Sequence, residues 1–192
     1  MSAFNRRQLL TSGTTALTFS ALLASQTEGE QTGLTPFLVR SGEARRGGPW
    51  LIRGEKAFST KVSGADIGNK YTAIEVHTPP GHGPELHVHL RQNELFFMLG
   101  GSIGLQCGSD RTILNAGDTL MAPANIPHAF VVLGKDSAHI LMIFDPAGSM
   151  ESYFAEYASA VNANADTKKL AEIAAKHEMK VVGPPLKASS FA

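Results

Sequence analysis

Short apolar runs separated by turn residues occupy residues 50–145, and this alternation limits the possible folds more than any other feature of the chain. Runs of about four to eight residues at such spacing indicate an all-β sandwich or barrel. The prolines fall between the runs, as a strand ladder requires, because proline has no backbone N–H to donate. We predict an all-β domain over residues 31–147, with strands in KYTAIEVHT, ELHVHL, ELFFML, IGLQC, RTIL, TLMA, HAFVVL and AHILMIF.

The pattern changes after Asp145. SMESYFAEYASAV and TKKLAEIAAKHEM are rich in alanine, glutamate and lysine, with apolar residues three and four positions apart, which predicts two α-helices within residues 148–192. Asp166 or Thr167 is placed to cap the second helix, and KVVGPPL is expected to follow as an extended tail. We expect both helices to pack on the outside of the β-domain, away from any catalytic role.

The beginning of the chain has the pattern of an export signal. Arg6 and Arg7 precede Leu9, Leu10 and a mildly apolar stretch, which is typical of a twin-arginine signal. The alternative is a disordered N-terminus that happens to contain two arginines. The stretch is too short and too polar for a permanent membrane span. We predict a signal and flexible arm over residues 1–30, with export to the periplasm or the exterior.

The charge of the chain is balanced. Lysine and arginine number 17, aspartate and glutamate also number 17, and neither sign forms a long run. Proteins that bind nucleic acid usually carry a basic patch or stripe. Nucleic acid is therefore excluded as a predicted partner.

Four side chains form a candidate metal site. His87 and His89 lie one residue apart in a predicted strand, so they share a face with their Cα atoms about 6.7 Å apart. Glu94 follows after a short turn, and His128 comes much later in PANIPHAF. Three imidazoles and a carboxylate can hold a divalent transition metal (Fe, Mn, Ni, Co, Cu or Zn) and leave one or two coordination positions open.

The neighbours of Glu94 indicate that this site is buried. Phe96 and Met98 share its face of the strand, and the other face is also apolar, with Leu95, Phe97 and Leu99. Because an unpaired buried charge is costly, the histidines and the glutamate need partners, and one metal ion satisfies them together. The alternative for an H-x-H strand taken alone is a pair of surface or hydrogen-bonded histidines.

Two segments resemble the motifs of the cupin superfamily. GHGPELHVHLRQNELFFMLGG is similar to the first motif, G-x5-H-x-H-x(3,4)-E-x6-G, and GDTLMAPANIPH is similar to the second, G-x5-P-x-G-x2-H-x3-N. Two positions depart from the second motif, with Asn125 in place of its second glycine and Val132 in place of its asparagine. Asparagine tolerates a left-handed backbone better than most residues, so the turn can survive. The matching positions are Gly81, His87, His89, Glu94, Gly101, Gly117, Pro123 and His128.

The later segments DPAG and GPPL and the helical tail resemble the single-domain quercetinase-like cupins. This resemblance implies a double-stranded β-helix, usually dimeric, in which the metal is held by residues His87, His89, Glu94 and His128. It also implies a metal-dependent dioxygenase that uses O2. A homodimer agrees with the apolar residues on both faces of one strand, since a partner would cover the outer face.

The residues around the site favour an apolar or aromatic substrate. A strand period of two directs Phe96, Met98 and Phe130 to the same interior as the ligands. His82 lies in a turn near the expected mouth, where it touches substrate or is simply solvated. Glu94 is the candidate catalytic residue, accepting the proton of an enol or phenol that binds the metal together with O2.

Two other functions remain open. One is a periplasmic binding or sensing protein that uses the same pocket without turnover, and the other is a metal-dependent isomerase of sugars or small acids. An isomerase needs polar or basic residues inside, for which Arg91 and Gln106 are the main candidates. Among the remaining histidines we expect His77 to be structural, His139 to lie at the start of a strand with a structural or supporting role, and His177 to be at the surface.

Overall fold

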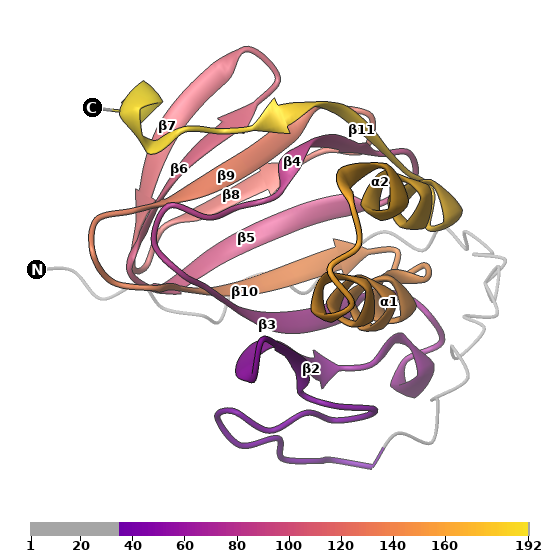
Figure 1. Ribbon diagram of the computed structural model, residues 1–192. Coiled ribbons are helices and arrows are strands. Elements are labelled where there is room, and N and C mark those ends of the chain that lie inside the picture. Colours follow the sequence, from indigo (N-terminus) through magenta and orange to yellow (C-terminus); the bar gives the residue numbers. More distant parts are fainter. Residues whose placement is uncertain (1–34, 192) are drawn as a thin grey trace, which may run out of the picture. The chain divides into compact units, whose positions relative to one another are not determined.

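The computed structural model describes residues 35–191, and two antiparallel sheets form its framework (Figure 1). The segment predicted to be an export signal lies outside these residues. The six-stranded sheet has the order β1-β2-β3-β10-β5-β8, and the five-stranded sheet has the order β11-β4-β9-β6-β7. No helix in this part of the chain has the length and apolar character needed to cross a membrane.

The first sheet brings together strands from both ends of the β-region: β1 (Trp50–Ile52), β2 (Glu55–Val62), β3 (Thr72–Thr78), β10 (Ala138–Asp145), β5 (Asn93–Gly100) and β8 (Thr119–Ala122). The second sheet contains β11 (Met179–Pro185), β4 (Glu85–His89), β9 (His128–Leu133), β6 (Ser102–Cys107) and β7 (Asp110–Asn115). Two helices, α1 (Met150–Asn162) and α2 (Thr167–Lys176), and two 3-10 turns, Gly64–Asp66 and Ala188–Phe191, complete the described chain.

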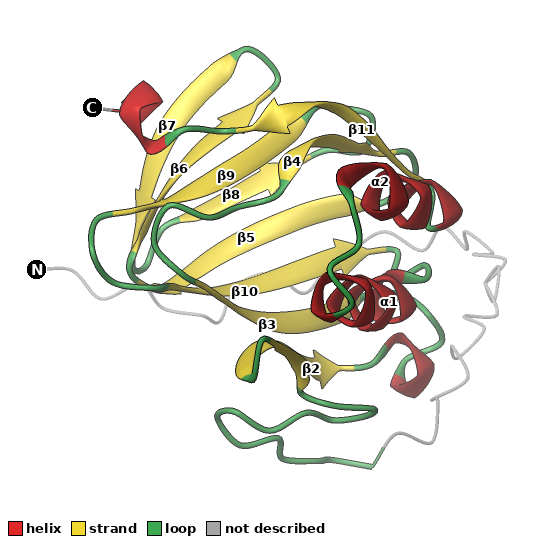
Figure 2. Ribbon diagram, viewed as in Figure 1, coloured by secondary structure: helices red, strands yellow, loops and turns green. Residues whose placement is uncertain are grey.

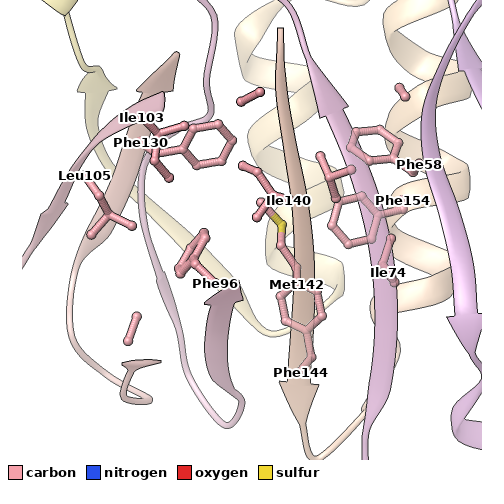
Figure 3. Close-up of a cluster of buried hydrophobic side chains, with 14 of the residues drawn as sticks. Phe58, Ile74, Phe96, Ile103, Leu105, Phe130, Ile140, Met142, Phe144 and Phe154 are labelled. Atoms are coloured by element: carbon pink, nitrogen blue, oxygen red, sulfur yellow. The ribbon is translucent and has the colours of Figure 1, made fainter. Parts of the chain in front are cut away.

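The hydrophobic core lies between the two sheets (Figure 3). Alternate residues of β10 are buried, as expected for a strand with one face on a core. Phe96, Ile103 and Ile140 are among the core residues with at most 1% of their surface exposed. Two sheets whose alternate side chains meet over one core form the double-stranded β-helix implied by the motifs.

The predicted strands from residue 72 onward are confirmed, most of them within one or two residues. Strands β1 and β2 were not predicted individually. The tail KVVGPPL was expected to be merely extended, but it forms most of β11, which pairs with β4 at the edge of the second sheet. An edge strand presents unpaired N–H and C=O groups, and β11 satisfies them on β4. Asn125 adopts a φ of 66°, which agrees with its expected left-handed turn.

Helix α1 lies against β1 and β2 of the first sheet (Figure 2). The prediction that both helices lie only on the outside is wrong for α1, because its inner face belongs to the core. Phe154 of α1 packs into the core, with its ring centroid 4.6 Å from that of Phe58 and 5.8 Å from that of Phe144. The prediction of a surface position for His177 is also wrong, since only 3% of it is exposed. Its Nδ1 lies 2.8 Å from Ser149 Oγ, because the chain after α2 folds back over the beginning of α1.

Candidate metal centre

The four predicted ligands come from three strands and both sheets. His87 and His89 lie on β4, and His128, the first residue of β9, is the cross-strand partner of His87. Glu94 lies on β5 of the opposite sheet, with its side chain directed between the sheets. The H-x-H spacing of a single strand thus supplies two imidazoles, and sheet packing adds the third imidazole and the carboxylate.

The structure brings these four side chains together. Glu94 Oε2 lies 2.9 Å from His128 Nε2 and 3.1 Å from His89 Nε2. One nitrogen or oxygen from each of His87, His89, Glu94 and His128 lies within 4.8 Å of those of the other three. His89, Glu94 and His128 are buried, and His87 is half-buried at the edge of the cavity described below.

The donor set fits a divalent transition metal. The Nδ1 atoms of His87 and His128 lie 2.8 and 2.9 Å from the carbonyl oxygens of Glu85 and Ile126. A ring that donates from Nδ1 to a carbonyl presents its Nε2 lone pair to a metal, so these two contacts set the tautomer that ligation needs. Three imidazole nitrogens and one carboxylate oxygen suit such ions and leave room for further ligands.

The electrostatics of the cluster agree with this assignment. Burial, with the adjacent His128 and His89, lowers the pKa of His87 to about 3, so its ring is neutral at pH 7. Burial alone would raise the pKa of Glu94, but hydrogen bonds from His128 and His89 outweigh it and hold that pKa well below its usual range. Burial would lower the pKa of His128, yet Glu94 raises it overall. A metal would displace the proton that His128 shares with Glu94, because it binds the deprotonated forms of both.

A cavity of about 450 Å³ adjoins the four ligands. This volume is within the range of about 300–1,000 Å³ that is usual for small-molecule sites. Of the predicted substrate-binding residues, Phe96, Phe130 and His82 line it. Met98 shares the interior face of β5 with 1% of its surface exposed, but it lies in the core outside the cavity lining.

Two parts of the cavity wall were missed by sequence reasoning. One is the hairpin of β1 and β2, and the other is α1, whose lining residues are Met150, Tyr153, Phe154, Tyr157 and Val161. Their helical spacing gave a detectable signal, because an aromatic stripe on a helix requires a partner surface. Arg91 and Gln106 do not line the cavity. Arg91 pairs with Glu178 at 3.3 Å, and Gln106 accepts a hydrogen bond from Arg111 at 3.1 Å.

A second group of titratable side chains lies on the other face of β3 and β10. Glu75 Oε1 lies 2.8 Å from His139 Nε2, and Glu75 Oε2 lies 2.9 Å from Lys61 Nζ. His77 stacks on His139 with 4.1 Å between ring centroids. Burial alone would raise the pKa of Glu75, but Lys61 and His139 outweigh it and lower that pKa. The lysine already balances the buried carboxylate, so this group is a structural ion-pair network.

The part of the barrel that carries the three histidines and the glutamate matches a known protein family. Residues 74–144 match the family described as the cupin domain. The match spans β3 to β10 and includes all four candidate ligands.

The chain is also similar to quercetin 2,3-dioxygenase of Bacillus subtilis strain 168. The two are 28% identical over 95 residues, which is 50% of this chain and 27% of that protein. The matched region therefore spans about a quarter of the length of this curated relative.

Solved structures with a similar fold include KdgF from Halomonas sp. and a predicted oxalate decarboxylase from Thermotoga maritima. The first is 20% identical with a TM-score of 0.44, and the match covers 50% of this chain and 87% of that one. The second is 21% identical with a TM-score of 0.45, and the match covers 50% and 86%.

Proposed function

We propose that this protein is a metal-dependent dioxygenase of the quercetinase-like type, acting on a flavonoid or another aromatic or enolic small molecule. The observation that carries the proposal is the convergence of His87, His89, Glu94 and His128 at the wall of a cavity lined mainly by aromatic and aliphatic side chains. The similarity to quercetin 2,3-dioxygenase supports the same reaction class. A dioxygenase places both atoms of O2 in the product, so no external reductant is needed.

The metal would be held by His87, His89, Glu94 and His128, and when bound it would supply a Lewis-acidic, redox-active centre for substrate and O2. The chain itself orients the substrate and excludes water. Phe96, Phe130 and Phe144 present apolar surface beside the ligands, which suits a flat ring. Both imidazole contacts of Glu94 use Oε2, so Oε1 is available to accept the substrate's enol or phenol proton.

The test uses Glu94→Gln, which keeps the size of the side chain and removes its charge. Metal analysis of the wild-type protein should give about one equivalent of a divalent transition metal, and an oxygen electrode should record uptake with a flavonol, a catechol or a β-diketone. The variant should lose at least about 100-fold in O2 uptake and bind metal more weakly. Glu172→Gln, at an exposed position of α2 outside the cavity lining, is the matched control and should behave as wild type.

Full metal content and full O2 uptake in Glu94→Gln would contradict both roles of Glu94. Metal-replete wild-type protein that takes up no O2 with any of these compounds would favour the non-catalytic binding or sensing protein. An isomerase is the weaker alternative, because the charged residues of the lining lie mainly on the exposed hairpin, at Arg53, Glu55 and Lys56.

We also propose export by the twin-arginine route, on the basis of Arg6 and Arg7. Replacing both arginines by lysine should leave the precursor in the cytoplasm, as fractionation and immunoblotting would record. Unchanged export of the double variant would contradict this proposal. A route that carries folded proteins would let the metal be inserted before export.

The proposed assembly is a homodimer. The outward face of the six-stranded sheet carries apolar residues that no described segment fully covers, among them Phe97, Leu99 and Met121, with 37%, 43% and 51% of their surface exposed. A second copy would cover this face, and the balanced charge of the chain imposes no net repulsion between copies.

A further inference from the structure

One wall of the cavity is a single face of α1. Met150, Tyr153, Phe154, Tyr157 and Val161 all line the cavity, and their spacings of three and four residues place them along one stripe of the helix. The metal ligands lie on β4, β5 and β9, so a ligand in the cavity contacts strands that carry the metal centre and a helix that does not.

The helix is held at both ends, which makes this wall rigid. At its start, the carboxylate of Glu151 accepts hydrogen bonds from Gly64 N at 2.9 Å and from the hydroxyl of Ser63 at 3.0 Å. At its end, Asn162 accepts from Arg53 N and donates to the carbonyl of Leu51, both at 2.8 Å. Side chains on a fixed helix are pre-organised for binding, because little of their freedom is lost when a ligand arrives.

Two phenol groups are the polar part of this wall. Tyr153 and Tyr157 are half-buried, and they line the cavity. Within residues 35–191, neither hydroxyl is among the fully buried polar atoms that lack a hydrogen-bond partner. Burial raises both pKa values, so each phenol stays protonated and can donate a hydrogen bond. The rings contact each other, with centroids 5.7 Å apart.

The other lining side chains of α1 are apolar, as are Phe96, Phe130 and Phe144 on the strands. A sugar or a small dicarboxylic acid would leave several polar groups unpaired against such walls, at a high desolvation cost. A planar polyphenol buries its ring faces on the aromatic side chains and needs polar partners only at its oxygen atoms. The cavity therefore suits a ligand with one oxygenated end at the metal centre and a second oxygenated ring against α1.

We infer that Tyr153 and Tyr157 form a phenol-binding subsite on α1, which holds the substrate ring remote from the metal centre by ring contact and by hydrogen bonds to its hydroxyl groups. This inference rests on the proposed function in taking an aromatic substrate for the cavity. It adds the prediction that selectivity for hydroxylated over unsubstituted remote rings comes from α1.

The experiment compares quercetin with 3-hydroxyflavone, which has the same skeleton and only the enolic hydroxyl. Affinities are measured by calorimetry under anaerobic conditions, so that no turnover intervenes. The wild-type protein should bind quercetin about tenfold more tightly than 3-hydroxyflavone. The double variant Tyr153→Phe, Tyr157→Phe keeps both rings and should lose most of this preference while binding 3-hydroxyflavone as before.

The matched control is Tyr71→Phe, since Tyr71 is the remaining tyrosine of the chain and lies outside the cavity lining. It should keep the wild-type preference. An unchanged preference in the double variant, or no binding of either flavonol by wild-type protein, would overturn the subsite. O2 uptake by the wild-type protein is measured separately. A preference for quercetin that depends on the two tyrosines, without O2 uptake, would support the subsite and refute the dioxygenase. O2 uptake together with a preference that does not depend on the tyrosines would support the dioxygenase and refute the subsite.

Discussion

At the scale of single residues, the structure balances each buried carboxylate differently. Glu94 is balanced by two imidazoles, Glu75 by Lys61, and Asp66 by two arginines. A buried charge is tolerated only when such partners are present. Among the carboxylates of residues 35–191, Glu94 is the one that lies among three histidines at the edge of the cavity, which are the surroundings expected of a ligand in a catalytic metal site.

Asp66 gives a prediction on the pH dependence of stability. Arg45 and Arg46 lower the pKa of the Asp66 carboxyl to about 2, below its ordinary value of about 3.9. A carboxylate whose pKa is depressed in the folded state stabilises fully above its unfolded pKa, and this contribution disappears as the pH falls through the folded pKa. Asp66→Asn should therefore lower the free energy of unfolding by about 1 kcal/mol at pH 7 and by about half as much at pH 3. The effect is this small because half of the Arg46 side chain is exposed, so that water screens its charge.

Urea unfolding at the two pH values measures this difference. Asp136→Asn, at an exposed position in the loop before β10, is the control and should change stability little at either pH. A loss for Asp66→Asn that is equal at pH 7 and pH 3 would contradict the assignment to the two arginines.

At the scale of elements, local signals decide where α2 begins. Asp166 precedes α2 with an extended backbone, and its Oδ1 accepts a hydrogen bond from Lys169 N at 2.8 Å. This is the N-cap arrangement, which satisfies one of the free N–H groups of the first turn. The helix packs against α1 and β11, so its start also positions the end of the chain that covers β4.

Asp166→Ala should lower the free energy of unfolding by about 1 kcal/mol, because the cap acceptor is lost. Asp166→Asn keeps an acceptor at the same position and should lose much less. Thermal unfolding followed by circular dichroism distinguishes the two variants. Equal losses in both would indicate that the charge of Asp166, rather than its cap hydrogen bond, is what matters.

At the scale of the whole molecule, the two faces of the six-stranded sheet have different roles. The inner face carries Glu94 and the core, and the outer face carries a continuous apolar row formed by cross-strand neighbours. Ile143 pairs with Leu95 and Leu95 with Met121, while Leu141 pairs with Phe97. An exposed apolar surface of this kind usually marks an interface.

The proposed homodimer is tested by the double variant Phe97→Lys, Leu99→Lys on this outer face. Light scattering coupled to size exclusion should give a dimer for the wild-type protein and half that mass for the variant, because each lysine would place a charge in the interface. Ile113→Lys, on the exposed face of β7, is the control and should remain dimeric. A monomeric wild-type protein would contradict the proposal, as would a dimeric double variant.

The sequence by itself determined the strands from residue 72 to residue 145, both helices and the four candidate ligands. The strands, the helices and the pair His87 and His89 depend on short-range patterns: alternation with a period of two, apolar spacing of three and four, a cap residue, or two histidines on one strand face. Glu94 and His128 lie in separate segments and were added by the resemblance of those segments to the two cupin motifs. The turn at Asn125 could also be predicted, because it depends on the backbone preference of one residue.

The tertiary structure alone decided which surfaces these elements cover. It placed α1 with Tyr153 and Tyr157 against the cavity, paired β11 with β4, and buried His177 against Ser149. Those contacts join segments far apart in the chain, and the same local pattern is compatible with a helix face turned to solvent or to a cavity. The arrangement that forms is the one that buries all the apolar faces together with the lowest free energy. This free energy depends on every element at once and cannot be read from any single segment.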